Sequence, residues 1–159
     1  EEFEMRTFDL LRTLPISLNS IVLGKLFATL ILVFIILIPT AVFVYSIGQL
    51  GSPSGNFDAS LIIGSYIGLV LLCSVFICLS TLASVLVSKQ SLAFVIGLVF
   101  NFICWQGMQE IPALETWSVY THYQQMSKGV IDGSSVLYFL GLGLLLSGLI
   151  RLRLDLKFA

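Results

Sequence analysis

The sequence predicts an all-α polytopic transmembrane helix bundle with four spans. Of the 159 residues, 57% are hydrophobic and only 11% are charged, with a mean hydropathy of +1.02, whereas about 25% of residues are charged in a typical soluble domain. Four blocks carry no charge and together hold 100 residues: 26–57, 59–88, 90–109 and 133–150. Apolar runs of about 18 or more residues are typical of membrane-spanning helices. This composition excludes a soluble enzyme and a disordered chain, and a net charge of −1 leaves no basic face for nucleic acid.

The first segment, EEFEMRTFDLLRTL, predicts a short amphipathic helix ahead of the first span. Its apolar stripe recurs at helical spacing and consists of Phe3, Thr7, Leu10, Leu11 and Leu14. Acidic residues lie toward its start and basic residues toward its end, which suits the helix dipole, and Pro15 ends it. The helix is expected at the membrane surface or on a partner protein. Because the chain begins with Glu1 and not Met, we expect it to be part of a longer protein.

The four predicted spans cover 21–48, 59–87, 91–109 and 134–150. Pro39 lies inside the first, where neighbouring helices can satisfy the carbonyl that a bend sets free. The second is longer than a hydrocarbon core of about 30 Å requires, so it must tilt, kink or project into water. The connection to the third span is very short, which predicts that these two helices form an antiparallel pair.

The segment 110–133 is the longest stretch between spans, and it is long for a structureless loop. Trp105, Trp117, Tyr120 and Tyr123 gather near its boundary, as aromatic anchors do at the headgroup level. We expect a short helix at about 119–131.

Lysine and arginine are distributed unevenly between the two sides of the predicted bundle. One side holds Arg6, Arg12, Lys25, Lys89, Arg151, Arg153 and Lys157. The other side holds only Lys128. The positive-inside rule therefore predicts that the N-terminal segment and the C-terminus are cytoplasmic, and that 49–58 and 110–133 face outward.

No constellation of side chains predicts catalysis. His122 is the single histidine and matches no triad spacing, so we interpret it as a polar residue at the interface. Cys73, Cys78 and Cys104 lie in apolar blocks without metal-ligand spacing, and no metal site is expected.

The largest polar side chains within the spans are Asn101, Gln106 and Gln109, all in the outer half of the third span. They either join helices by hydrogen bonds or line a path, and we favour the first interpretation because such bonds are common in bundles. The absence of buried charge argues against ion-coupled transport.

A resemblance to a known family rests on the N-terminal segment. The run 2–17 and the sequence that ends in Gly24-Lys25 resemble the cytoplasmic signature of ABC-2 type permeases, approximately E-x-x-x-G-T-x-E-x-L-L-x-T-x-P-[IV]-[ST] followed by [IV]-x-x-G-K. The matching positions are Glu2, Thr7, Leu11, Thr13, Pro15, Ile16, Ser17, Gly24 and Lys25. Asp9 stands for the usual Glu, and Arg6 stands for the usual Gly. Two further stretches, 65–94 and 122–140, are similar to the gliding-motility-associated branch.

The resemblance implies a permease subunit of an ABC transporter in the bacterial inner membrane. A complete permease has six spans, so this chain looks like spans three to six with the preceding cytoplasmic loop. Residues 1–17 would hold the coupling helix, which seats on a separate ABC ATPase subunit. Its contact residues would be Glu2, Phe3, Thr7, Asp9, Leu10, Leu11, Leu14 and Pro15.

The same resemblance implies that this chain is not an enzyme and holds no cofactor, because ATP and Mg²⁺ bind to the ATPase. A second permease half would complete the path as a homo- or heterodimer among membrane lipids. The alternative that the sequence leaves open is a membrane scaffold or assembly protein that does not transport. The sequence does not name a substrate.

Overall fold

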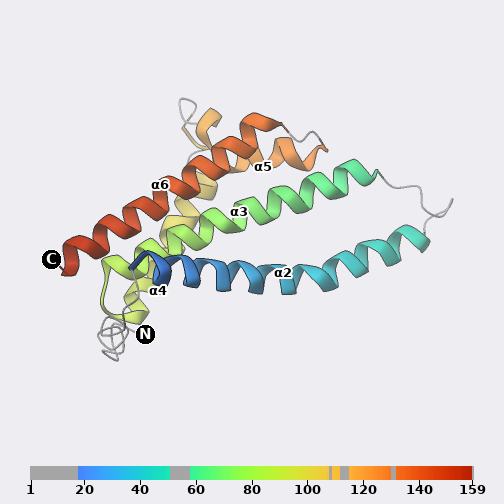
Figure 1. The fold of residues 1–159 in the computed structure, drawn as a ribbon. Helices are drawn as coiled ribbons and strands as arrows, with labels where there is room; N and C mark the ends of the chain where they lie inside the picture. The colour runs from blue at the N-terminus through green and yellow to red at the C-terminus, as the bar shows by residue number, and fades with distance from the viewer. Residues whose placement is uncertain (1–17, 51–57, 108, 112–114, 130–131, 159) are drawn as a thin grey trace.

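The computed structural model of the chain describes residues 18–50, 58–107, 109–111, 115–129 and 132–158. Within these residues the fold contains helices and no strand (Figure 1). The elements in chain order are α2 (Leu18–Leu50), α3 (Ala59–Leu86), α4 (Gln90–Phe102), the π-helix η1 (Ile103–Gly107), the 3-10 helix η2 (Glu115–Trp117), α5 (Val119–Ser127) and α6 (Gly133–Phe158). The predicted all-α bundle is confirmed.

Four helices in the described residues are long and apolar enough to cross a membrane. They are Ser20–Leu50, Ala59–Leu86, Gln90–Gly107 and Gly133–Leu156. The predicted number of spans is therefore confirmed. α2 continues through Pro39 as one helix of 33 residues, whereas α4 passes into η1 before the third span ends.

The last helix, α6, continues well beyond the apolar run that predicted a span over 134–150. The segment after Ile150 alternates leucine with arginine, aspartate and lysine, all of which a helix accommodates, and it contains neither Gly nor Pro. Arg151 and Asp155 are also neighbours one turn apart, with Nε and Oδ2 at 3.8 Å. The charge-free apolar run therefore ends before the helix does.

α3 is the central helix and packs against α2, α4, α5 and α6 (Figure 1). Its buried residues include Leu72, Val75 and Leu79, which form one apolar core with Met126 of α5 and Phe139 of α6. The expected pairing of the second and third spans is present, because α3 and α4 are joined by residues 87–89 alone and pack along each other.

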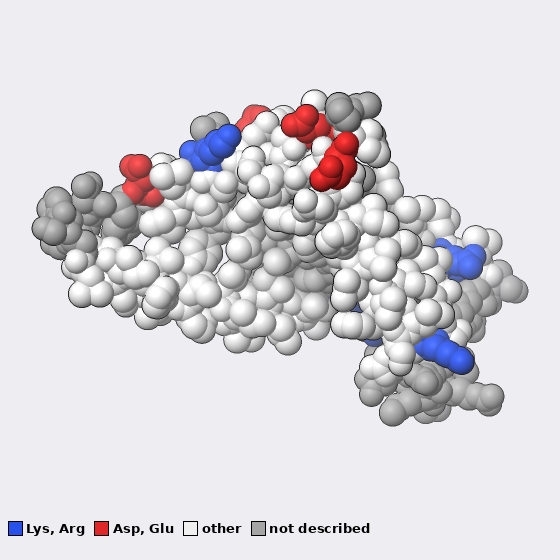
Figure 2. All heavy atoms as spheres, turned by 180° about the vertical axis from the view of Figure 1, so that it is seen from behind, with Lys and Arg blue, Asp and Glu red and all other residues white. Residues whose placement is uncertain are grey.

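The two ends of the bundle carry different charges. A small apolar cluster of Val85, Ile150 and Leu154, with Ile21 packed against it, brings together the start of α2 and the ends of α3 and α6. Lys25, Lys89, Arg151 and Arg153 flank this cluster in the sequence, and we call this end of the bundle the basic end. The opposite end carries Asp58, Glu110, Glu115 and Asp132, together with Lys128. Figure 2 shows acidic side chains toward one end of the molecule, with a basic patch among them, and further basic side chains toward the other end.

The short helix α5 lies on α3 with very close backbone contact. A Cβ atom placed on Gly64 of α3 would lie 2.4 Å from the Met126 oxygen and 3.3 Å from Gly129 Cα. At Gly68, one turn further, a Cβ atom would meet Met126 Cβ at 3.2 Å and Tyr123 Cδ2 at 3.3 Å. Gly129 itself has a φ of 80°, which suits glycine at the turn that follows α5. Gly64 and Gly68 therefore allow α5 to lie directly against the backbone of α3.

Large apolar side chains cover the outward faces of α2, α4 and α6. Phe43, Phe94 and Leu144 are 67%, 70% and 73% exposed, respectively. A soluble protein does not present apolar faces of this extent. Hydrocarbon chains of a bilayer are the environment that such faces fit.

Candidate functional site

The predicted coupling residues lie outside the described residues, because the structure describes the chain from residue 18 onward. This applies to Glu2, Phe3, Thr7, Asp9, Leu10, Leu11, Leu14 and Pro15. The candidate site in the structure is therefore built from the segment that follows them in the sequence, at the start of α2.

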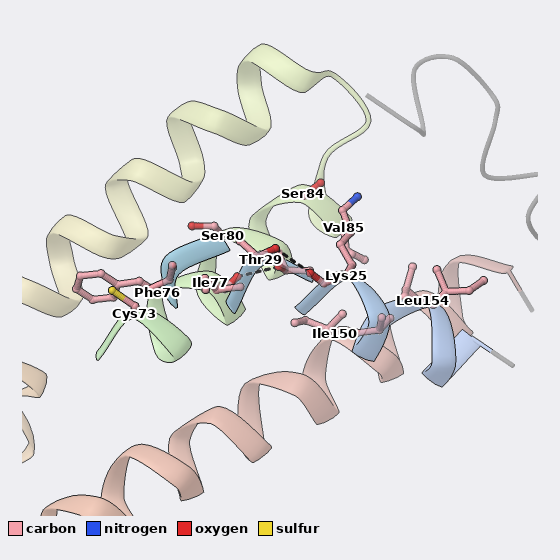
Figure 3. Close-up of a pocket in the computed structure, with 14 residues that line it drawn as sticks. Lys25, Thr29, Cys73, Phe76, Ile77, Ser80, Ser84, Val85, Ile150 and Leu154 are labelled. Carbon is pink, nitrogen blue, oxygen red and sulfur yellow. Dashed lines mark hydrogen bonds between the residues drawn. The ribbon is translucent and has the colours of Figure 1, made fainter. Parts of the chain in front are cut away.

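A groove of about 430 Å³ opens at the basic end between α2, α3 and α6 (Figure 3). Its wall is mainly apolar, with Val22 and Val33 from α2, Ile77 from α3, and Ile150 and Leu154 from α6. We call it the basic-end groove. Its apolar wall continues the core cluster that joins the three helix ends.

The polar lining of this groove is concentrated on two helices. Thr29 Oγ1 donates to the Lys25 carbonyl oxygen at 2.7 Å, and Thr81 Oγ1 donates to that of Ile77 at 2.8 Å. These two hydroxyl protons are therefore engaged within their own helices. Lys25 extends toward Ser84 and Val85, with its nitrogen at the far end of the side chain (Figure 3). The cationic end of the groove is consequently the end nearest the α3–α4 turn.

A second groove, of about 660 Å³, lies between α3 and α4. Phe76, Ser80 and Ser84 line both grooves. Asn101 of α4 bridges this second groove, with Nδ2 donating to Ser80 Oγ at 2.9 Å. Its Oδ1 atom is buried without a hydrogen bond in the described part of the chain.

The three predicted polar residues of the third span make different contacts. Asn101 joins α4 to α3, which is the helix-joining role. Gln109 Nε2 instead donates to the Trp105 carbonyl oxygen of its own segment at 3.0 Å. Gln106 is exposed. Of the three, Asn101 is the one whose side chain forms a hydrogen bond with another of the described helices.

The predicted aromatic cluster closes around the end of α4. Trp105 lies edge-on to Tyr120, with ring centroids 4.9 Å apart, and its ring also contacts Phe76 at 6.3 Å and Tyr123 at 6.1 Å. Because Trp105 sits in η1 and both tyrosines sit in α5, these rings join the end of α4 to the short helix. Trp117 contributes its backbone, since its carbonyl oxygen accepts a hydrogen bond from Tyr138 Oη at 2.5 Å.

His122 forms a polar joint between α5 and α6. Its Nδ1 atom lies 3.1 Å from Ser135 Oγ, and its ring stacks on Tyr138 with centroids 4.2 Å apart. Ser135 is fully buried and also donates to Gln125 Oε1 at 3.1 Å. Burial lowers the pKa of His122, while a hydrogen bond with the Thr116 backbone and the negative charge of Asp132 act in the opposite direction.

A family model described as "ABC-2 family transporter protein" matches residues 1–128. This match covers most of the chain, including the predicted coupling segment, α2, α3, α4 and α5.

The chain belongs to the ABC-2 transporter family.

Proteins of this family are the membrane components of transporters and are not themselves the catalytic subunits. Family membership and four apolar helices together identify an integral membrane protein. The searches of curated proteins and of solved structures returned no match. The family match does not extend to the gliding-motility-associated branch.

The described part of this ABC-2 protein holds no group of three or more His, Cys, Asp or Glu side chains that could bind a metal ion. Cys73, Cys78 and Cys104 are free thiols.

Lys25, Ser80 and Ser84 line the basic-end groove, a role that was not predicted from the sequence. In the sequence, Lys25 bears only on the orientation and on the ABC-2 signature, and neither serine has a predicted role. Ser80 and Ser84 are one turn apart, so they lie on the same face of a helix. That spacing, together with a lysine near the start of the preceding span, is the signal that could have indicated the groove.

Proposed function

We propose that this chain is the permease subunit of an ABC-2 type exporter that works with a separate ABC ATPase. The observation that carries the proposal is the family match over residues 1–128, which extends over both the N-terminal signature and three of the four apolar helices. ATP and Mg²⁺ would bind to the ATPase, and this chain would supply the helices that move.

The N-terminal segment is the proposed contact with the ATPase. A helix that transmits motion must present an apolar stripe to a groove on its partner, and Phe3, Leu10, Leu11 and Leu14 would supply one. It must also be joined to a span by a short connection. Only a few residues separate Pro15 from α2, so a displacement of the segment would reach α2 directly.

The proposal also includes a second permease half and a link to surface motility. A second permease half, identical or different, would complete the path across the inner membrane. The similarity of 65–94 and 122–140 to the gliding-motility-associated branch suggests a link to surface motility. That link rests on the residues alone, because the family model makes no such distinction.

The proposal is tested by co-purification of the full-length protein with its proposed ATPase partner. Leu11→Asp in the full-length protein puts a charge in the apolar stripe, and we expect it to abolish recovery of the ATPase and ATP-dependent transport. Met5→Asp is the matched control, because Met5 lies on the opposite side of the predicted helix, and this variant should retain the ATPase. Normal association and transport with Leu11→Asp would favour the scaffold interpretation.

A further inference from the structure

We propose that the basic-end groove binds one anionic glycerophospholipid, with the phosphate held by Lys25 and Ser84 and an acyl chain lying along α2 and α3. This inference rests on the membrane placement of the helices and does not depend on the proposed ATPase partner.

The donors at the cationic end of the groove match a phosphate group. Lys25 contributes an ammonium group with three donors. The Ser84 hydroxyl has no hydrogen-bond partner among the described residues, in contrast to Thr29 and Thr81, whose protons are engaged. An ammonium group on α2 and a hydroxyl group on α3 are complementary to the non-bridging oxygens of a phosphodiester.

The remainder of the groove favours a lipid over a soluble phosphate. Val33, Phe76 and Ile77 line it away from Lys25, and they lie inside the membrane-spanning segments. A soluble anion would leave this apolar wall without a matching partner, whereas a phospholipid supplies an anionic head and an apolar chain in one molecule. A volume of about 430 Å³ is within the range of ligand pockets.

The position of the groove along the membrane normal also fits a lipid headgroup. Lys25 lies near the start of the span Ser20–Leu50, and Ser84 lies near the end of the span Ala59–Leu86. Both therefore lie close to one membrane surface. Lys89, Arg151 and Arg153 belong to the same end of the bundle, and basic residues at a membrane surface enrich anionic lipids around them.

The test uses the full-length protein purified in detergent, with bound lipids counted by native mass spectrometry. We expect phosphatidylglycerol to be retained in preference to phosphatidylcholine. Lys25→Gln should weaken phosphatidylglycerol binding about tenfold and Ser84→Ala about threefold, as expected for loss of a charged and a neutral hydrogen-bond donor. Lys25→Arg keeps the charge and should retain binding.

Lys89→Gln is the matched control, because it removes a lysine from the same end of the bundle but from outside the groove lining. It should change phosphatidylglycerol binding less than twofold. An equal loss with Lys89→Gln, equal retention of the two lipids by the wild type, or unchanged binding by Lys25→Gln would overturn the proposal. Competition by glycerol 3-phosphate as effective as that by the lipid would also overturn it, because the acyl chain would then contribute nothing.

Recovery of the ATPase is measured on the same variants, so that the two proposals are separated. If a variant loses its lipid preference but still recovers the ATPase, the effect is confined to the groove. If the wild type does not recover the ATPase, the proposed function is contradicted, whereas the lipid proposal is still tested by the lipid measurement.

Discussion

His122 connects two elements through a single side chain. Its Nδ1 atom contacts Ser135 of α6, its ring stacks on Tyr138, and burial favours its neutral form. Ser135 carries one proton and has both His122 and Gln125 as neighbours. The tautomer and the protonation state of the imidazole together therefore determine the direction of the hydrogen bonds in this joint.

The lowered pKa of His122 predicts a pH dependence of stability. A side chain whose pKa is lower in the folded than in the unfolded state stabilises the fold above its unfolded value, here 6.5, and this contribution is lost as the pH falls through the folded pKa. The thermal unfolding midpoint of the wild type in detergent should therefore fall between about pH 7 and about pH 5.

His122→Gln is the control for this prediction, because it removes the titrating ring and keeps a polar side chain. Its unfolding midpoint should change little over the same range. Asp132 does not contribute to this pH dependence. Hydrogen bonds from Ser134 lower the pKa of Asp132 below the usual 3.8, so the contribution of its carboxylate to the stability of the fold is lost only at more acidic pH. An equal pH slope in the wild type and in His122→Gln would contradict the assignment.

At the scale of the elements, the contact between α5 and α3 depends on the absence of a side chain. The backbone of the turn after Met126 approaches Gly64 too closely for any other residue. The buried residues Val119 and Met126 then fill the space between α5 and the core. Glycine thus permits close approach, and these apolar residues supply the packing.

Gly64→Ala tests this arrangement. A methyl group there would lie 2.4 Å from the Met126 oxygen, so the backbone of α5 must shift. The expected cost is about 1 to 3 kcal/mol of unfolding free energy, measured by chemical denaturation in micelles with Trp fluorescence as the readout.

Gly141→Ala is the matched control, since it introduces the same methyl group into a helix where nothing lies within 4 Å. This variant should be neutral or up to about 1 kcal/mol more stable, because alanine favours the helix over glycine. Similar destabilisation by both substitutions would show that the close contact at Gly64 does not matter.

The spans were predictable as elements because a bilayer demands continuous apolar segments, and charge interrupts them at 58, 89 and 110. The end of α6 was not predictable in this way, because a helix can continue through a segment in which leucine alternates with charged residues. The π-helix at Ile103–Gly107 also has no marker in the apolar pattern. It is defined by which backbone groups pair, and not by which residues are apolar.

At the scale of the whole molecule, the charge distribution separates the two ends of the bundle. Lys25, Lys89, Arg151 and Arg153 lie at one end, and most of the described acidic residues lie at the other (Figure 2). The sequence predicts that basic residues gather on one side of the bundle, and the described basic residues other than Lys128 do so. The reason is that alternating helix directions bring the α3–α4 turn and the end of α6 back to the start of α2.

This distribution predicts the orientation in the membrane. In a background where Cys73, Cys78 and Cys104 are replaced by serine, Lys89→Cys should react with a membrane-impermeant maleimide only after the cytoplasmic side is opened. Lys128→Cys should react in intact cells, as the positive-inside rule requires. Labelling of Lys89→Cys in intact cells would invert the assignment.

The two grooves form only where helices that are distant in the sequence pack together. The basic-end groove combines side chains from α2, α3 and α6 that are far apart in the sequence. Periodicity shows which face of a helix is apolar, but it does not show which other helix that face meets. The second groove is likewise formed only once α4 lies beside α3, and the bond between Asn101 and Ser80 links positions 21 residues apart.

One consequence follows from the uninterrupted course of α6. The helix contains 26 residues, about 39 Å of rigid rod, and it contacts both surfaces of the protein. Near its start Ser135 and Tyr138 hold α5, and near its end Ile150 and Leu154 form part of the groove wall. A hydrogen-bonded helix does not shorten, so a tilt about the position where Leu146 packs into the core would move both of its ends together. A tilt of α6 that widened the groove would therefore also shift α5.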